Sequence, residues 1–363
     1  MSKILNEFIK RIDGPLFSIS FLLIILGLIT LAGSNLETSK IIVNQIFNIS
    51  VGLIIFTLVI FTNPRILFGY APILFFLTIF LLVLVHFFGI ESNGAKRWLA
   101  FGGLNLQPSE LIKITLPLMI AWLYQNFQNK ISLKVHLIAI FLILVPVYLV
   151  LLQPDLGTSI MIALSGFLII FLAGISWRLI LSSLVITILS SPIIWMNLHI
   201  YQKNRILNML DPFADPLGTG YHTIQSMIAI GSGGGFGKGW GQGSQTNLNF
   251  LPEANTDFIF AVYAEEFGFF GVILIFALFL FLIYRIFNLA NDMQDTFSKL
   301  LTVSLGASIF AAIFVNIAMI SGLVPVVGLP LPFMSYGGTS MVVSLISIGI
   351  IMNLNNHKTL IAN

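Results

Sequence analysis

The sequence contains no cysteine and very little charge. Without cysteine, the chain can form no disulfide framework, no thiolate metal ligand and no thiol nucleophile. Only 9% of its 363 residues are charged, whereas a soluble domain carries about 25%. Its 17 basic and 14 acidic side chains are too few to cover the water-facing surface of a soluble protein of this length. This scarcity excludes a soluble globular enzyme, a disordered chain and a coiled coil.

Long apolar runs fill the chain instead. Hydrophobic residues make up 57% of it, and its mean hydropathy is +1.00. Runs of about 20 apolar residues recur and are continuous, unlike the short alternating strands of a membrane β-barrel. We therefore expect an all-α polytopic membrane protein, a single integral membrane domain over residues 1–363 with about ten transmembrane helices. The expected spans are about 15–33, 43–62, 67–89, 108–125, 135–152, 158–174, 179–200, 257–284, 300–323 and 339–354.

The basic residues of the loops predict an orientation. Cytoplasmic loops carry an excess of Lys and Arg. With a cytoplasmic N-terminus, the short inner connectors hold Lys3, Lys10, Arg11, Arg65, Lys130, Lys134, Arg178, Arg285, Lys299 and Lys358. The longer outer loops hold Lys40, Lys96, Arg97, Lys203, Arg205 and Lys238. We expect both termini to be cytoplasmic.

The pI of the chain is about 9.1, which could suggest a nucleic-acid partner. Because the basic residues are scattered singly and form no patch, we expect no such partner.

Unusual residues gather in the outer connections. The longest connection, about 201–256 between spans seven and eight, is expected to be a large extracytoplasmic loop, and loops of that length are usually functional. Further outer segments with Gly, Pro and charged residues are about 90–107, 153–158 and 324–338. The inner loops are short. We therefore expect the functional chemistry on the extracytoplasmic face.

Two opposite charges lie inside the fourth expected span. Glu110 and Lys113 are three residues apart, within ion-pair reach on one helix face. Ionisable groups inside a membrane are costly and usually have a partner and a task. Two interpretations stay open: a self-neutralised structural pair, or a pair in a polar cavity that orients a substrate.

Two aspartates begin apolar runs on the outer side. Asp257 is either a helix N-cap or a catalytic carboxylate, because a short acidic side chain suits both roles. Glu253, Glu265 and Glu266 make its surroundings acidic, and such crowding raises a carboxylate pKa toward that of a general base. Asp155, between Pro154 and Gly157, is favoured as a helix cap.

The outer cations also have two interpretations. Lys96, Arg97 and Trp98 form either an interfacial aromatic with two snorkelling bases or a clamp for phosphate oxygens. The glycine-rich stretch 231–243 contains Lys238 but lacks the Gly-Lys-Ser/Thr ending of a P-loop, so no nucleotide site is expected. We expect it to be a flexible loop that lets the backbone approach a ligand.

Together these segments resemble the SEDS glycosyltransferases, polytopic enzymes of bacterial cell-wall synthesis. The resemblance runs in order along nearly the whole chain. Residues 236–245 and 325–332 are more similar to the elongation (RodA-like) branch than to the division (FtsW-like) branch. The segments that carry the overall resemblance are 93–98 (NGAKRW), 107–110 (QPSE), 153–158 (QPDLGT), 251–253 (LPE), 256–260 (TDFIF) with 265–266 (EE), and 335–339 (SYGGT).

The resemblance implies polymerisation of lipid II at the outer face of the cytoplasmic (inner) membrane, with Asp257 as the essential carboxylate. It also implies a divalent cation, Mg²⁺ or Mn²⁺, for which Asp257 is a candidate ligand, and a class B penicillin-binding protein as partner within the elongation complex. One departure is Asn255, where family members commonly have histidine. The candidate substrate-binding residues are Lys96, Arg97, Trp98, Glu110, Lys113, Asp155, Lys238, Glu253 and Ser335.

A lipid II flippase that works by alternating access is the rival interpretation, since ten spans and intramembrane charges suit a transporter equally well. A transporter should line a path on both faces, whereas the unusual residues here lie on one face. A non-catalytic scaffold ranks last, because it need not keep Asp257 with its acidic surroundings.

Overall fold

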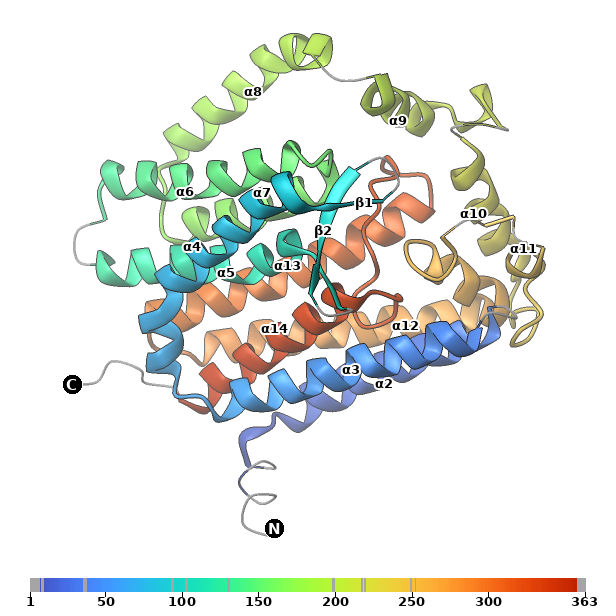
Figure 1. The fold of residues 1–363 in the computed structure, drawn as a ribbon, viewed down its shortest axis with the longest axis horizontal. Helices are drawn as coiled ribbons and strands as arrows, with labels where there is room; N and C mark the ends of the chain where they lie inside the picture. The colour runs from blue at the N-terminus through green and yellow to red at the C-terminus, as the bar shows by residue number, and fades with distance from the viewer. Residues whose placement is uncertain are drawn as a thin grey trace.

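The computed structural model describes residues 7 and 10–357, apart from 35–37, 93–94, 102–103, 129–130, 198–199, 217, 219, 249 and 252. A helix lies over each of the ten expected spans (Figure 1). These helices are α2 (Gly14–Gly33), α3 (Thr38–Phe61), α4 (Pro64–Phe88), α5 (Pro108–Asn126), α6 (Leu133–Leu151), α7 (Leu156–Leu172), α8 (Trp177–Asn197), α12 (Ile259–Asn291), α13 (Thr296–Ile320) and α14 (Gly338–Asn356).

Among the described residues, 7 helices are long and apolar enough to cross a membrane: α2, α3, α4, α6, α12, α13 and α14. Helix α7 is apolar but has only 17 residues. Helix α5 carries the charged pair Glu110 and Lys113. The all-α polytopic fold is therefore confirmed, and the number of ten spans stays a prediction.

The outer connections have more structure than the sequence predicted. The segment expected as a long loop contains α9 (Ile200–Leu210), the 3-10 helix η2 (Pro212–Ala214), α10 (Tyr221–Ser232) and α11 (Ser244–Asn247). The connection before α5 forms a three-stranded antiparallel sheet in the order β1 (Ile90–Ser92), β2 (Ala95–Phe101), β3 (Leu104–Leu106). Strands β1 and β3 have 3 residues each, too few for an alternating pattern, and the 7 residues of β2 (AKRWLAF) do not alternate between apolar and polar.

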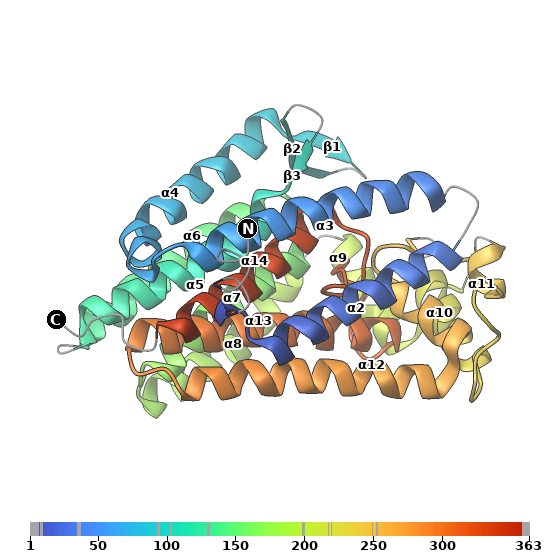
Figure 2. The same cartoon turned by 90° about the horizontal axis from the view of Figure 1, so that it is seen from below.

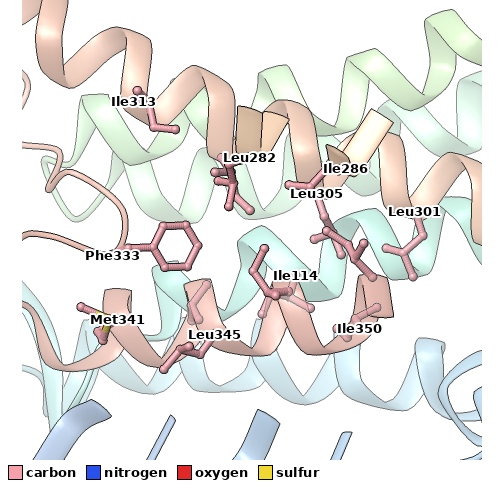
Figure 3. Close-up of a cluster of buried hydrophobic side chains, with 14 of the residues drawn as sticks. Ile114, Leu282, Ile286, Leu301, Leu305, Ile313, Phe333, Met341, Leu345 and Ile350 are labelled. Atoms are coloured by element: carbon pink, nitrogen blue, oxygen red, sulfur yellow. The ribbon is translucent and has the colours of Figure 1, made fainter. Parts of the chain in front are cut away.

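Helices α5, α12, α13 and α14 meet around a cluster of apolar side chains (Figure 3). Ile114, Leu282, Leu305 and Leu345 come from these four helices, and Phe333 comes from the segment between α13 and α14. Since lipid tails are as apolar as leucine, such helices associate mainly by close packing. The cluster fixes the segment that leads into α14, which forms part of the candidate site.

The helix ends divide the molecule into two poles. Helix α2 begins and α14 ends at one end of the bundle, whereas α10 and α11 lie at the other end (Figures 1 and 2). Large apolar side chains such as Leu58, Phe80 and Leu280 are exposed along the helices, as expected for surfaces that face lipid. The arrangement is consistent with both termini on one side of a membrane.

Candidate active site

Asp257 lies in a tight turn immediately before α12. The backbone N–H groups of Thr256 and Phe258 donate to the carbonyl of Glu253 (3.1 and 3.3 Å), and Glu253 has a left-handed φ of 56°. Helix α12 has Phe258 at its N-cap position and no side-chain cap hydrogen bond. The Asp257 carboxylate therefore does not cap α12, and among the described residues no group donates a hydrogen bond to it. It faces Gly328, where an added Cβ would lie 3.3 Å from Oδ2.

The turn is fixed to the segment before α14. Asn316 of α13 is fully buried, and its Nδ2 donates to the carbonyls of Asp257 (2.9 Å) and Leu329 (2.6 Å). The hydroxyl of Ser335 donates to the carbonyl of Thr256 (2.6 Å) and accepts from the backbone N–H of Leu331 (2.7 Å). Ser335 therefore holds two loops together beside Asp257, so that the carboxylate has a fixed position.

The first two helices support the same unit. Ser34, which follows α2, donates to Oδ1 of Asn255 (2.5 Å). Gln45 of α3 is buried and donates to the carbonyl of Ser335 (3.0 Å), while its own carbonyl accepts from the N–H of Gly337 (3.3 Å). Side chains from both ends of the chain thus converge on the turn that carries Asp257.

The surroundings of Asp257 disfavour its charge. Burial, followed by the negative charge of Glu253, raises its pKa to about 6, with Asp155 adding a smaller effect. The positive charges of Arg205 and Arg97 act in the opposite direction. A carboxylate that titrates near neutral pH can hold a proton during a reaction and release it afterwards, as a general base must.

Arg97 of β2 binds the loop that carries Asp155. The guanidinium of Arg97 donates to the carbonyls of Gln153 (3.2 Å) and Pro154 (2.6 Å). Asp155 accepts from the N–H of Thr158 (3.0 Å) at the start of α7, which confirms its role as a helix cap. Both groups therefore have a structural partner, and each also contributes charge to the field around Asp257.

The Glu110 and Lys113 pair lies in an adjoining cavity. Lys113 Nζ and Glu110 Oε1 are 2.6 Å apart, with side chains only 12% and 5% exposed. The pair thus forms the expected ion pair and also lines a cavity, and its role in orienting a substrate stays a prediction. The other lining residues are Leu305, Ser308, Ile309, Ala312, Leu329, Pro330, Pro332, Ser340, Val343, Ser344 and Ser347. Leu329 joins this cavity to Asp257, because Asn316 binds both backbones.

Other predicted residues lie elsewhere. Lys238 forms an ion pair with the fully buried Glu265 (2.6 Å). Strand β2 has a register shift opposite Ile90 and Glu91, so its side chains do not alternate regularly from Lys96 to Trp98. Lys96 pairs in register with Glu91, and Trp98 with Ile90. A substrate-binding role for these three residues stays a prediction.

Sequence reasoning missed Arg205 and Asn316. Arg205 was counted only as a loop charge, yet α9 brings it close enough to act on the pKa of Asp257. Asn316 interrupts an apolar run in α13, and a lone polar residue in such a run is the signal that could have identified it.

Metal ions in proteins are commonly held by groups of His, Cys, Asp or Glu side chains. Within the described part of the chain, no three His, Cys, Asp or Glu side chains are grouped so that they could hold a metal ion.

A bundle of apolar helices with a buried carboxylate, two nearby arginines and an adjoining cavity defines a polytopic membrane protein with a polar site at one end. The profile of the FtsW/RodA/SpoVE family, described as "Cell cycle protein", matches residues 14–360. "Peptidoglycan glycosyltransferase MrdB" of Escherichia coli K12 is 47% identical over 319 residues, which cover 88% of this chain and 86% of the relative. The protein of the same name from Helicobacter pylori J99 is 38% identical over 360 residues, 96% of this chain and 89% of the relative.

Solved structures agree with the sequence comparison. The Thermus thermophilus rod shape determining protein RodA has a TM-score of 0.73 at 28% identity, over 95% of this chain and 97% of that one. A chain from the structure "Structural coordination of polymerization and crosslinking by a peptidoglycan synthase complex" has a TM-score of 0.84 at 33% identity, over 95% and 98%. The chain belongs to the FtsW/RodA/SpoVE family, also known as the SEDS family, and matches its RodA (MrdB) members.

Proposed function

We propose that this chain polymerises lipid II into glycan strands at the outer face of the cytoplasmic membrane, with Asp257 as the general base. It is a peptidoglycan glycosyltransferase of the elongation type, as its relatives MrdB and RodA indicate. The observation that carries the mechanistic part is the fixed carboxylate of Asp257, which has a pKa raised to about 6 and no hydrogen-bond donor among the described residues.

The transfer step needs a base. A sugar hydroxyl of one lipid-linked chain attacks the anomeric carbon of another, forming the new glycosidic C–O bond. The bond from that carbon to the pyrophosphate oxygen breaks with inversion, and the hydroxyl proton passes to Asp257. A positioned general base contributes roughly 10²–10⁴-fold to such a rate. Undecaprenyl pyrophosphate leaves with the bonding electron pair, so the activated phosphoester supplies the energy.

Charge on the leaving pyrophosphate must be offset. Arg97 and Arg205 are the cations that act on Asp257, and guanidinium groups suit phosphate oxygens. The guanidinium of Arg97 already donates to two carbonyls, and these bonds fix its orientation at the binding site. The expected cation, Mg²⁺ or Mn²⁺, stays part of the proposal: substrate phosphates would hold it together with the Asp257 oxygen that does not take the proton, and when bound it would neutralise leaving-group charge.

The adjoining cavity suits substrate orientation. Glu110 and Lys113 offer a fixed acceptor and donor, and Ser308, Ser340 and Ser344 add hydroxyl groups. The cavity has a volume of about 40 Å³, so it admits a substituent of a substrate and not a whole sugar. Because Leu329 borders the cavity and is bound by the same Asn316 that holds Asp257, a substituent bound there would have a fixed position relative to the carboxylate.

The chain is a multi-pass membrane protein. We propose the inner membrane as its location, with Asp257 facing outward, on the basis of the loop charges. A class B penicillin-binding protein within the elongation complex is the proposed partner. Support for this comes from the similar chain that belongs to a peptidoglycan synthase complex coordinating polymerisation and crosslinking.

The experiment that separates polymerase from flippase uses the purified chain in detergent micelles with lipid II and Mg²⁺ or Mn²⁺. Micelles have no sidedness, so a flippase gives no product there, whereas a polymerase forms glycan strands visible by gel electrophoresis. Strand formation is the expected result. A chain that moves lipid II across vesicles but forms no polymer, with or without its partner, would contradict the proposal.

A further inference from the structure

A second cavity lies at the opposite end of the bundle from Asp257. It has a volume of about 320 Å³ and is formed where α5 and α7 end and α13 begins. In the orientation proposed above, this end is cytoplasmic. A cavity this far from the turn at Asp257 is not part of the glycosyl-transfer site. Its walls come from apolar residues, among them Ile131, Leu172, Ala173, Leu300 and Val303.

The cavity entrance carries polar groups with unused bonding capacity. Asp295 Oδ2 accepts from the N–H of Ser298 (2.8 Å) and caps α13, but its Oδ1 is buried without a hydrogen-bond partner. Lys299, one turn further along α13, is exposed, and its side chain forms no ion pair or hydrogen bond with any residue that the structure describes. The cavity lining thus carries an exposed cation at its entrance and, deeper in the wall, a carboxylate oxygen without a partner.

Further bases flank this entrance along the chain. Lys134 lies three residues beyond the wall residue Ile131, and Arg178 lies five residues beyond Ala173; both side chains are exposed. Basic pockets between transmembrane helices on the cytoplasmic side bind phospholipid head groups. Apolar walls beneath a basic entrance match the two parts of a lipid, an acyl chain and a phosphate.

We propose that this cavity binds an inner-leaflet phospholipid whose head group has both a phosphate and a hydrogen-bond donor. The phosphate pairs with Lys299, and the donor, either a glycerol hydroxyl or an ammonium, bonds Oδ1 of Asp295. Acyl carbons contact Leu172 and Leu300. Phosphatidylglycerol and phosphatidylethanolamine meet both requirements. Phosphatidylcholine has the phosphate but no donor, so it lacks the second contact.

The test is native mass spectrometry of the full chain in detergent, titrated separately with these three lipids. We expect phosphatidylglycerol, phosphatidylethanolamine or both to bind about tenfold more tightly than phosphatidylcholine, the fold-change of one hydrogen bond to a charged group. The first two titrations show whether the hydroxyl or the ammonium is the preferred donor. Equal affinity for all three lipids would overturn the proposal.

Two variants assign the contacts. Lys299→Gln should weaken binding of the preferred lipid about tenfold, whereas Lys40→Gln, an exposed lysine at the other end of the bundle, should leave it unchanged. Asp295→Asn can keep the cap, because its amide oxygen still accepts from Ser298, but presents an N–H₂ group where Oδ1 was. It should abolish the preference over phosphatidylcholine. Unchanged lipid preference in both variants would reject the site even if wild-type selectivity were observed.

Discussion

Asp257 combines burial with a fixed backbone, and both features matter for its chemistry. Asn316 and Ser335 hold the turn on either side of the carboxylate. Burial and the charge of Glu253 raise the pKa of Asp257 to about 6. The carboxylate is therefore ionised at physiological pH, yet basic enough to accept a proton in a transition state.

Because Asp257 must be ionised to act, the rate of polymerisation should fall about tenfold for each pH unit below about 6. Glu253→Gln removes a negative charge that raises the pKa of Asp257, so this acid limb should move to lower pH. The measurement is the pH profile of kcat/KM with lipid II. Glu91→Gln, which changes an exposed glutamate in β1, serves as the control. An acid limb that stays in place or moves to higher pH would contradict the assignment.

The same raised pKa affects stability. A carboxyl group whose pKa is higher in the folded than in the unfolded chain stabilises the fold at low pH, and this stability is lost as pH rises through about 6. Asp257→Asn cannot ionise, so it should have a higher Tm than the wild type at pH 8, with the difference vanishing near pH 4. A lower Tm at pH 8 would show that the charged carboxylate is instead a stabilising group.

Single residues were predictable where their chemistry conflicts with their surroundings. An acid before an apolar run, or Glu110 and Lys113 inside one, is visible in the sequence without knowledge of the fold. The contacts of Arg97 were not visible, because its carbonyl partners lie 56 and 57 residues away and present no side-chain signal. Ser335 was identified only through the family resemblance, and its position shows that it anchors the site.

At the scale of elements, the glycine-rich stretch packs against α12. Helix α12 departs from helical geometry at Gly268 (φ 66°), and the N–H groups of Phe269 and Phe270 donate to the carbonyls of Gly234 and Gly235. Lys238 and the backbone N–H groups of Ser244 and Gln245 bind the buried Oε1 of Glu265. We expected the backbone of this stretch to approach a ligand closely. In the structure, the backbone that it brings close is that of helix α12.

This packing gives a test with a matched control. A Cβ added at Gly268 would overlap the backbone of Gly237, and one added at Gly237 would overlap the carbonyl of Glu266; both glycines have positive φ. Gly268→Ala and Gly237→Ala should each lower the Tm by several degrees, the effect of a loss of 1 kcal/mol or more. Gly231→Ala adds a methyl group in open space and should be nearly neutral. Equal stability of all three variants would contradict the docked loop.

Helices within the membrane were easier to predict than those outside it. Continuous apolar runs of about 20 residues directly predict membrane helices, and each expected span has a helix. The outer helices α9 and α10 have mixed composition and were expected to be loop. Their positions depend on contacts with distant elements, such as the packing of α10 on α12, which no local pattern encodes.

At the scale of the whole molecule, the absence of cysteine allows a direct test of orientation. A single cysteine at exposed Leu248, in the outer segment after α11, should react with a membrane-impermeant maleimide in intact cells. A single cysteine at exposed Asp292, where α12 ends, should react only after the membrane is permeabilised. The reverse pattern would place Asp257 on the cytoplasmic side and rule out polymerisation at the outer face.

The measurement that tests the central claim most directly is lipid II polymerisation by purified Asp257→Asn. This isosteric change removes the base and leaves the backbone contacts of Asn316 and Ser335 in place. The matched control is Asp211→Asn, an exposed aspartate in the same outer segment. We predict that Asp257→Asn still binds lipid II but loses about 10²-fold or more of its polymerisation rate, while Asp211→Asn remains active. Polymerisation by Asp257→Asn at a rate close to that of the wild type would contradict the account.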